Sequence, residues 1–231
     1  MLKVENTAVY GWEAAIRGMR NPMNSWDKSD SGLTVMNPTD VEFGYEPNYE
    51  YIIGENDLNL MKTLAKAGTD HGKFLRMINV TVDLTAPLYW WKEFDTYKVG
   101  TVANSCSTMH KIHAKEFTLD DFSHEHLIVQ GVSILCDLII ALNEARDSYI
   151  NFDEYYDNNE LDERLTCKKD VWWQMIQLLP SSYNQKRTVQ LNYQVLKAMY
   201  FSRRNHKLDE WHTLCEWMEG LPYFREVVIQ E

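Results

Sequence analysis

The chain has 231 residues, of which 23 are basic and 34 acidic, so its formal net charge is −11. A protein that coats a nucleic acid uses clustered Lys and Arg to displace counterions, so this charge argues against a nucleic-acid partner. The length is sufficient for a large buried core and favours one domain over residues 1–231.

The N-terminal quarter combines short regular elements with a long polar stretch. Lys3–Val9 is predicted to form a strand and Trp12–Met19 a short helix. Residues 21–49 are rich in Asn, Asp, Ser, Gly and Pro, which indicates one long loop or a pair of loops. A helix is predicted from Asn56 to Ala67, because its apolar residues recur on one face and Gly68 follows as a stop.

The central part begins with a clear alternating pattern. Apolar and polar residues alternate over Leu75–Thr85, which predicts a half-buried strand. The next segment, residues 87–94, starts with proline and predicts a helix with that proline in its first turn. A polar loop over residues 97–110 follows. Residues 118–146 then predict one long helix or two, broken near Gly131.

The C-terminal part is predicted to be helical. The acidic stretch 147–163 is expected to bend back on the surface, and a helix starting at Asp162 or Thr166 is expected to run to Leu179. The last two helices are predicted over residues 188–204 and 208–219.

Two features indicate a cytoplasmic protein. The four cysteines contain no Cys-x-x-Cys pair, and the first residues show no secretory signal, so we expect reduced thiols. The longest apolar run, residues 127–142, is interrupted by polar side chains and is too short to span a bilayer, so no membrane partner is expected.

The most informative segment is Leu178–Trp211. It contains Leu-Pro-Ser-Ser-Tyr and then a predicted helix, with Asn192 twelve residues after Pro180 and Arg203 eleven residues further on. An amide and a guanidinium at the end of a helix can bind a phosphate-bearing ligand. The alternative is a solvated helix end.

This segment resembles the C-terminal signature of the flavin-dependent thymidylate synthases, the ThyX family. In that family the Asn contacts the flavin and the Arg contacts the nucleotide. The order of predicted elements is also similar over Gly54–Glu219. The resemblance implies an α/β (α+β) fold, with a mixed or antiparallel sheet flanked by long helices, assembled as a homotetramer.

The family's Arg-His-Arg signature is replaced in this chain. Counting from Pro87 places Thr96, Tyr97 and Lys98 on that triplet and Thr101 on the Ser that follows it. Two guanidiniums supply rigid bidentate forks, whereas a lysine supplies one mobile point charge. The family's Asn-Glu pair falls on Ala103-Asn104 or on Asn104-Ser105, and its Arg before Leu-Pro is replaced by Ile176.

The resemblance implies a set of site residues. The flavin contacts would be His71, Tyr97, Lys98, Thr101 and Asn192, with His71 two positions beyond the first histidine of the family's turn. The nucleotide contacts would be Asn104, Ser105, Ser107 and Arg203. No catalytic residue is assigned, because the family's reaction requires no protein nucleophile.

The implied function is thymidylate synthesis in nucleotide biosynthesis, by a flavoprotein methyltransferase or a hydroxymethylating variant. FAD would be the cofactor, dUMP the nucleotide substrate, methylenetetrahydrofolate the one-carbon donor and NADPH the reductant. Two alternatives stay open: a ThyX-like oligomer that binds nucleotide or flavin without catalysis, and a structural or regulatory oligomer.

Other patterns receive simpler interpretations. His110 and His113 could share a helical face, but His124 and His126 could not, and no Cys or carboxylate lies at a recognised ligand spacing. We therefore interpret these histidines as solvated or capping residues and expect no metal site. Cys106 is interpreted as an ordinary loop cysteine, because nearness in sequence does not establish a base within reach of its thiol. The adjacent tryptophan pairs are expected to pack in a core or a subunit contact.

Overall fold

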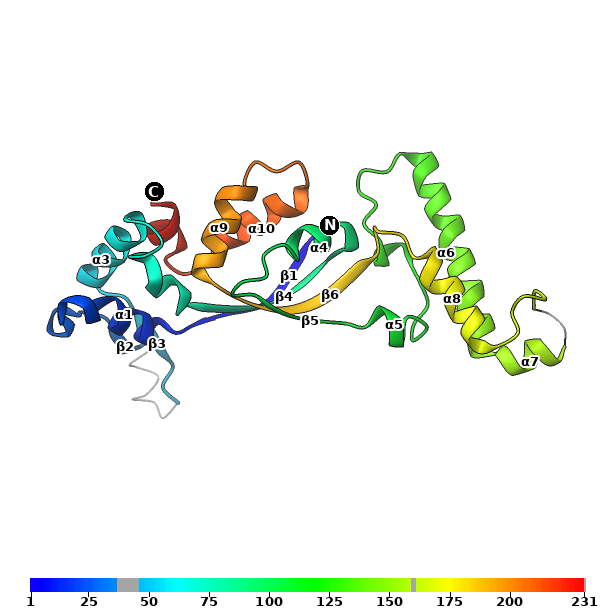
Figure 1. Cartoon of the computed structure of the whole chain (residues 1–231), viewed down its shortest axis with the longest axis horizontal. Helices are drawn as coiled ribbons and strands as arrows, with labels where there is room; N and C mark the ends of the chain where they lie inside the picture. The colour runs from blue at the N-terminus through cyan, green and yellow to red at the C-terminus, as the bar shows by residue number, and fades with distance from the viewer. Residues whose placement is uncertain (37–45, 159–160, 231) are drawn as a thin grey trace. The chain divides into compact units, whose positions relative to one another are not determined.

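The computed structural model describes residues 1–36, 46–158 and 161–230, which form a mixed α/β fold (Figure 1). The main sheet has the strand order β1-β4-β6-β5. Its strands are β1 (Lys3–Tyr10), β4 (Asn79–Pro87), β5 (Val102–Ser105) and β6 (Asn184–Asn192).

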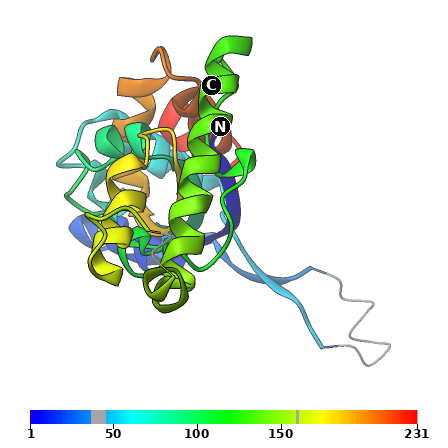
Figure 2. The same cartoon turned by 90° about the vertical axis from the view of Figure 1, so that its right-hand side faces the viewer.

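A second, two-stranded sheet lies within the stretch that the sequence predicts to be loops. Strand β2 (Gly32–Val35) pairs antiparallel with β3 (Tyr49–Ile52), in a register that places Gly32 opposite Ile52. Figure 2 shows the two strands side by side. The loop prediction is therefore wrong for these strands, and residues 37–45 lie outside the described residues.

The chain divides into two compact units, each built from separate segments. The first unit contains residues 1–3, 84–96 and 104–188, and the second contains residues 4–83, 97–103 and 189 onward. One domain over residues 1–231 stays a prediction.

The first unit is organised around two helices that pack side by side (Figure 1), α6 (Val129–Ile150) and α8 (Lys168–Leu178). Its smaller helices are α4 (Leu88–Phe94), α5 (Thr108–Lys111), η4 (Leu119–Asp121) and α7 (Phe152–Asp157). The apolar core between α6, α8 and the segment before α6 consists of Ile112, Phe117, Phe122, Leu135, Leu142 and Met175. Helix α6 begins at Val129, later than the predicted start at residue 118, so Gly131 lies in its first turn and does not interrupt it.

The second unit packs its helices around an aromatic core. Tyr193 lies at its centre, with ring centroids 5.4 Å from Trp12 and 5.5 Å from Phe224. The helices of this unit are α1 (Trp12–Arg20), η1 (Asn21–Met23), η2 (Trp26–Lys28), α3 (Glu55–Lys66), η3 (Gly72–Arg76), α9 (Tyr193–Arg203), α10 (Asp209–Glu219) and η5 (Arg225–Ile229).

The alternating pattern of β4 is confirmed. Val80, Val82 and Leu84 are buried, and the residues between them are only partly buried. The strand begins later than predicted because residues 72–76 form the helical turn η3. Among the described residues, no helix is both long and apolar enough to cross a membrane.

The predicted helix over residues 188–204 is wrong in its first part. Strand β6 continues to Asn192, and α9 begins only at Tyr193. Val189 and Leu191 are buried in alternation, the period of a strand, because β6 pairs between β4 and β5 in the sheet. Sheet pairing therefore overrides the helical spacing that Val189 shares with Tyr193 and Leu196.

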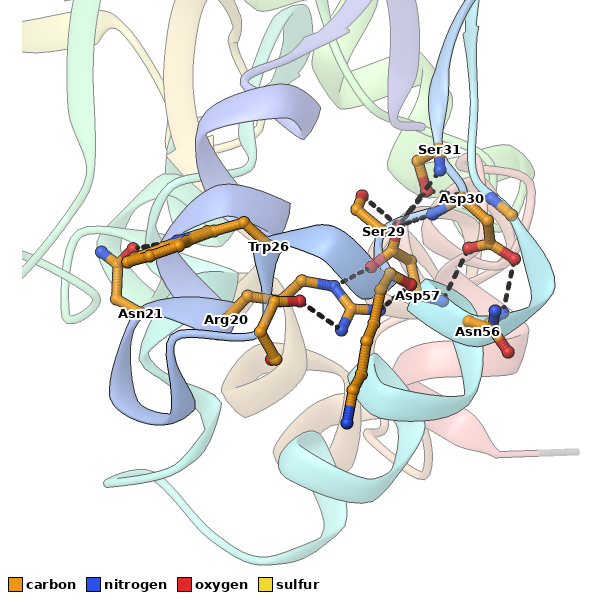
Figure 3. A network of polar contacts seen from close by, with 11 residues as sticks. Arg20, Asn21, Trp26, Ser29, Asp30, Ser31, Asn56 and Asp57 are labelled. Carbon is orange, nitrogen blue, oxygen red and sulfur yellow. Dashed lines mark hydrogen bonds and ion pairs between the residues drawn. The ribbon is translucent and has the colours of Figure 1, made fainter.

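A buried ion pair organises the second unit (Figure 3). Arg20 Nε donates to Asp57 Oδ1 at 2.6 Å, and the two residues are 4% and 0% exposed. Asp57 Oδ2 accepts hydrogen bonds from the hydroxyls of Ser29 and Ser31, both at 2.7 Å, and from the N–H of Asp30 at 3.1 Å. The carboxylate is thus surrounded by donors, as a buried charge requires.

The same network fixes the chain that follows α1. The guanidinium of Arg20 also donates to the carbonyl oxygens of Ser25 and Lys28. The Asp30 carboxylate accepts the N–H groups of Asn56 and Asp57, which would otherwise be unsatisfied at the start of α3. Residues 25–31 are therefore held between α1 and α3 by polar contacts.

We predict that Asp57→Ala lowers the free energy of unfolding by about 3–5 kcal/mol, because it leaves the Arg20 guanidinium buried without its counter-ion. Urea denaturation at pH 7 measures this loss. Glu13→Ala on α1 is the matched control, because it removes the exposed Arg17–Glu13 pair and should change stability by about 0.5 kcal/mol at most. Equal effects of the two substitutions would contradict the role of the buried pair.

The pH dependence follows from the same carboxylate. Burial by itself raises the pKa of Asp57, but the hydrogen bonds from Ser29, Ser31 and Arg20 outweigh it and hold the pKa below its ordinary value. The stabilisation is therefore complete above about pH 4 and is lost as the pH falls through the lowered pKa.

Candidate functional site

Arg203, at the end of α9, is held by two aromatic side chains. Its Nε donates to the hydroxyl oxygen of Tyr97 at 2.9 Å. Its guanidinium carbon lies 4.7 Å from the centroid of the Trp211 ring and 5.6 Å from that of Tyr97. These contacts give a long, flexible side chain a defined position, which favours binding of an anion.

Asn192 lies at the other end of α9, as its N-cap. Its Oδ1 accepts the N–H of Val195 at 3.1 Å, and its backbone is extended. The sequence predicts Asn192 within a helix, whereas the structure places it at the junction between β6 and α9. The amide group is the part of this side chain that remains able to donate to a ligand.

The segment 97–101 lies against α9. Gly100 has a φ of +79°, and a Cβ there would stand 2.8 Å from Asn192 Nδ2 and 3.1 Å from Val195 Cγ2. Only glycine accommodates both the left-handed backbone and this close approach. Because Tyr97 contacts Arg203, the segment follows α9 from its last turn to its first.

Thr101 and Lys98 lie in this segment with different exposure. The Thr101 hydroxyl is buried and has no hydrogen-bond partner among the described residues. Leaving such a group unsatisfied costs about 1–3 kcal/mol, so a bound polar ligand could recover that energy. Lys98 is exposed and carries the charge of the segment.

His71 precedes η3 and is exposed. The adjacent Gly72 is buried, and a Cβ there would lie 3.8 Å from Gln194 Oε1 in the first turn of α9. The turn 68–71 therefore lies close to the α9 end that carries Asn192. Nearby, burial lowers the pKa of Lys197, whose Nζ donates to the Ala65 carbonyl at 2.7 Å.

The other predicted nucleotide contacts belong to the first unit. Asn104 and Ser105 are exposed residues of β5, and Ser107 caps α5 by accepting the N–H of His110 at 3.0 Å. The predicted polar loop over residues 97–110 is therefore wrong in its second half, which contains a strand and a short helix. The structure thus groups His71, Tyr97, Lys98, Thr101, Asn192 and Arg203 in one unit, and Asn104, Ser105 and Ser107 in the other.

Sequence reasoning missed two residues of this site. Trp211 lies in the first turn of α10, eight positions after Arg203, and no sequence motif connects it with the guanidinium that it contacts. A glycine within a polar segment, such as Gly100, can indicate a turn or a close approach of the backbone. Its contact with Asn192, however, becomes evident only in the fold.

The other side-chain patterns have ordinary structural settings. Trp90 and Trp91 are fully buried, which confirms the core interpretation for this pair, whereas Trp173 of the second pair is 39% exposed. The Arg187 guanidinium lies 4.1 Å from the Trp91 ring centroid. His124 Nδ1 is 2.8 Å from the Phe122 carbonyl oxygen. Cys106 is exposed, and its backbone bonds with Lys186 and Gln185.

The fold has counterparts among solved structures. No family model matches this chain, and none of the curated proteins matches it in sequence. One similar structure is thymidylate synthase X (ThyX) from Helicobacter pylori with FAD and dUMP, at a TM-score of 0.62 and 14% identity, over 99% of this chain and 97% of that one. The chain has the ThyX fold.

A second H. pylori ThyX structure, also complexed with FAD and dUMP, gives the same result. Its TM-score is 0.61 at 14% identity, with 98% of this chain and 97% of that chain covered. The fold implied by the sequence resemblance is therefore confirmed. At this identity the likeness establishes the fold alone, and the ligands belong to the H. pylori protein.

We predict that Gly100→Ala destabilises the protein by more than about 1 kcal/mol, because alanine is strained at this φ and collides with Asn192. Gly32→Ala is the control, since its Cβ would meet no atom within 4 Å. Thermal and urea unfolding of both variants test the close packing of segment 97–101 on α9. A harmless Gly100→Ala would show that this packing is absent.

Proposed function

We propose that this protein is a flavin-dependent thymidylate synthase-like protein. It binds FAD and dUMP and transfers a one-carbon unit from methylenetetrahydrofolate to the nucleotide, with NADPH as reductant. The observation that carries the proposal is the packing of segment 97–101 along α9, between Asn192 and Arg203, in a chain with the ThyX fold. The H. pylori structures, which contain FAD and dUMP, support the choice of ligands.

The side chains present fit parts of these ligands. The reduced flavin, when bound, would supply the hydride. The Asn192 amide and the buried Thr101 hydroxyl would form hydrogen bonds with the flavin, and exposed Lys98 would pair with its pyrophosphate. Arg203, positioned by Tyr97 and Trp211, would bind the nucleotide phosphate.

Tyr97 lies in the triplet 96–98 that replaces the family's Arg-His-Arg, and its hydroxyl positions a residue of the proposed site. Where ThyX family members have a cationic triplet, this chain places a hydroxyl that fixes Arg203 at 2.9 Å. Lys98 then supplies one flexible charge where two guanidiniums would supply rigid forks. We therefore propose that flavin pyrophosphate is bound less tightly than by the Arg-His-Arg signature.

The second candidate function is binding of flavin or nucleotide without catalysis. It is favoured by the engagement of two site residues in structural contacts, since Asn192 Oδ1 caps α9 and the Tyr97 hydroxyl holds Arg203. A protein that binds both ligands but forms no dTMP from dUMP, methylenetetrahydrofolate and NADPH would have this second function.

We predict that Arg203→Ala weakens dUMP binding by about tenfold or more, because a charge-assisted contact with phosphate is lost. Isothermal titration with dUMP measures this change. Arg204→Ala is the matched control, because Arg204 is the next residue, is exposed and lies over the Phe201 ring instead. Equal affinities of the two variants would place the nucleotide elsewhere.

Asn192→Asp tests the flavin contact without removing the helix cap. Aspartate caps helices as well as asparagine does, so the folded state is retained, but the amide donor is lost and a negative charge faces the flavin phosphates. We expect FAD affinity to fall while the melting temperature of the apoprotein stays similar. Wild-type protein that is colourless and shows no thermal shift with FAD or dUMP would reject the proposal.

Self-association is a further part of the proposal, with a homotetramer as the expected assembly. Val129, Cys136 and Ile140 share one exposed face of α6, and the two apolar residues are 88% and 58% exposed. Exposed apolar side chains on one helix face are typical of subunit interfaces.

We predict that Val129→Glu with Ile140→Glu reduces the molar mass measured by light scattering, because charges would be buried at the interface. Leu33→Glu, on an exposed apolar residue of β2, should leave the mass unchanged. A wild-type protein of monomer mass at micromolar concentration would contradict the assembly.

A further inference from the structure

The first unit contains a pocket that the proposed function does not use. It has a volume of about 450 Å³ and lies between the α5 segment, the end of α6 and the beginning of α8. The side chains that define it are His110, His113, Tyr149, Lys168, Lys169 and Trp172. None of them belongs to the flavin or nucleotide contacts assigned above.

The walls of this pocket are fixed by specific contacts. Trp172 Nε1 donates to the Met109 carbonyl oxygen at 2.9 Å, which joins α8 to the α5 segment. Arg146 Nε donates to the His113 carbonyl oxygen at 3.0 Å. The His113 and Tyr149 rings have centroids 4.6 Å apart. The aromatic surface is therefore assembled before any ligand binds.

The charge of the pocket is opposite to that of the chain. Lys168 and Lys169 line it, and among the described residues no Asp or Glu does so, although the whole chain carries a net charge of −11. Asp170, the nearest acid along α8, accepts hydrogen bonds from Thr166 and Cys167 and lines a different pocket. The pocket is thus locally suited to an anion.

Charge and aromatic surface are adjacent in this pocket, and one ring nitrogen of a lining histidine has no partner among the described residues. Lys168 Nζ lies 4.8 Å from the Tyr149 ring centroid, so charge and aromatic surface are adjacent. His113 Nδ1 is buried and has no hydrogen-bond partner among the described residues. A planar ring could stack on Trp172 or Tyr149 while its phosphate pairs with the two lysines.

We propose that this pocket binds a phosphate ester of an aromatic ring system, of about the size of a nucleoside monophosphate. Lys168 and Lys169 bind the phosphate, and Trp172 and Tyr149 contact the ring. The volume lies within the range of pockets for small molecules of this kind. No described residue of segment 97–101 or of α9 lines this pocket.

AMP, adenosine and inorganic phosphate are the probes, titrated into the full-length protein by calorimetry. AMP should bind, and adenosine and phosphate should each bind at least about tenfold more weakly, because each lacks one half of the ligand. The double variant Lys168→Gln/Lys169→Gln should weaken AMP binding by about tenfold or more. Lys66→Gln/Lys92→Gln changes the charge equally at exposed lysines outside the pocket and should retain the wild-type affinity.

A further variant separates this site from the proposed nucleotide site. Arg203→Ala should leave AMP binding at this pocket unchanged, and Lys168→Gln/Lys169→Gln should leave dUMP binding at Arg203 unchanged. Loss of AMP binding in Arg203→Ala, no AMP binding at millimolar concentration, or equal binding of AMP and inorganic phosphate would each overturn the proposal.

Discussion

The junction between β6 and α9 is the constraint on which the candidate site depends. At Asn192 the chain leaves the sheet, and the side chain of the same residue caps the helix that follows. The next residue, Tyr193, donates its N–H to Ile78 and its hydroxyl to the Pro222 carbonyl, and its ring is fully buried. The junction therefore cannot shift without breaking contacts of the core. Everything that α9 carries, including Arg203, is positioned from this point.

Segment 97–101 is adapted to that helix at both ends. Gly100 allows the backbone to approach Asn192 at the beginning of α9. Tyr97 accepts a hydrogen bond from Arg203, which lies eleven residues after Asn192 at the other end of the helix. Arg203 is supported by a neutral hydroxyl and two aromatic rings, those of Tyr97 and Trp211. Residues 96–98 carry one lysine, so the local positive charge is lower than an Arg-His-Arg triplet would give. A well-supported arginine beside a weakly charged segment favours the proposal that the site binds its ligands more than the proposal that it catalyses the ThyX reaction at an unchanged rate.

The sequence is sufficient to predict an element when its hydrophobic periodicity matches the side of the element that is buried in the fold. The alternation of β4 and the apolar face of α3 are predicted correctly, because one side of each element faces the core. It was insufficient at Asn192, where a helical spacing extends back into a strand whose pairing comes from distant parts of the chain. The contact of Trp211 with Arg203 was missed for a related reason, since it depends on how α10 packs beside α9. The family resemblance supplied the fold that periodicity alone could not.

The most direct test of the account is Thr101→Val, measured for stability and for FAD affinity. Valine keeps the shape of threonine but removes a buried hydroxyl that has no partner among the described residues. If that hydroxyl is reserved for the flavin, the apoprotein should be as stable as wild type or more stable in urea, while FAD binding followed by flavin absorbance should weaken by about tenfold. Unchanged FAD affinity, or loss of apoprotein stability without any effect on FAD, would contradict the assignment of this site.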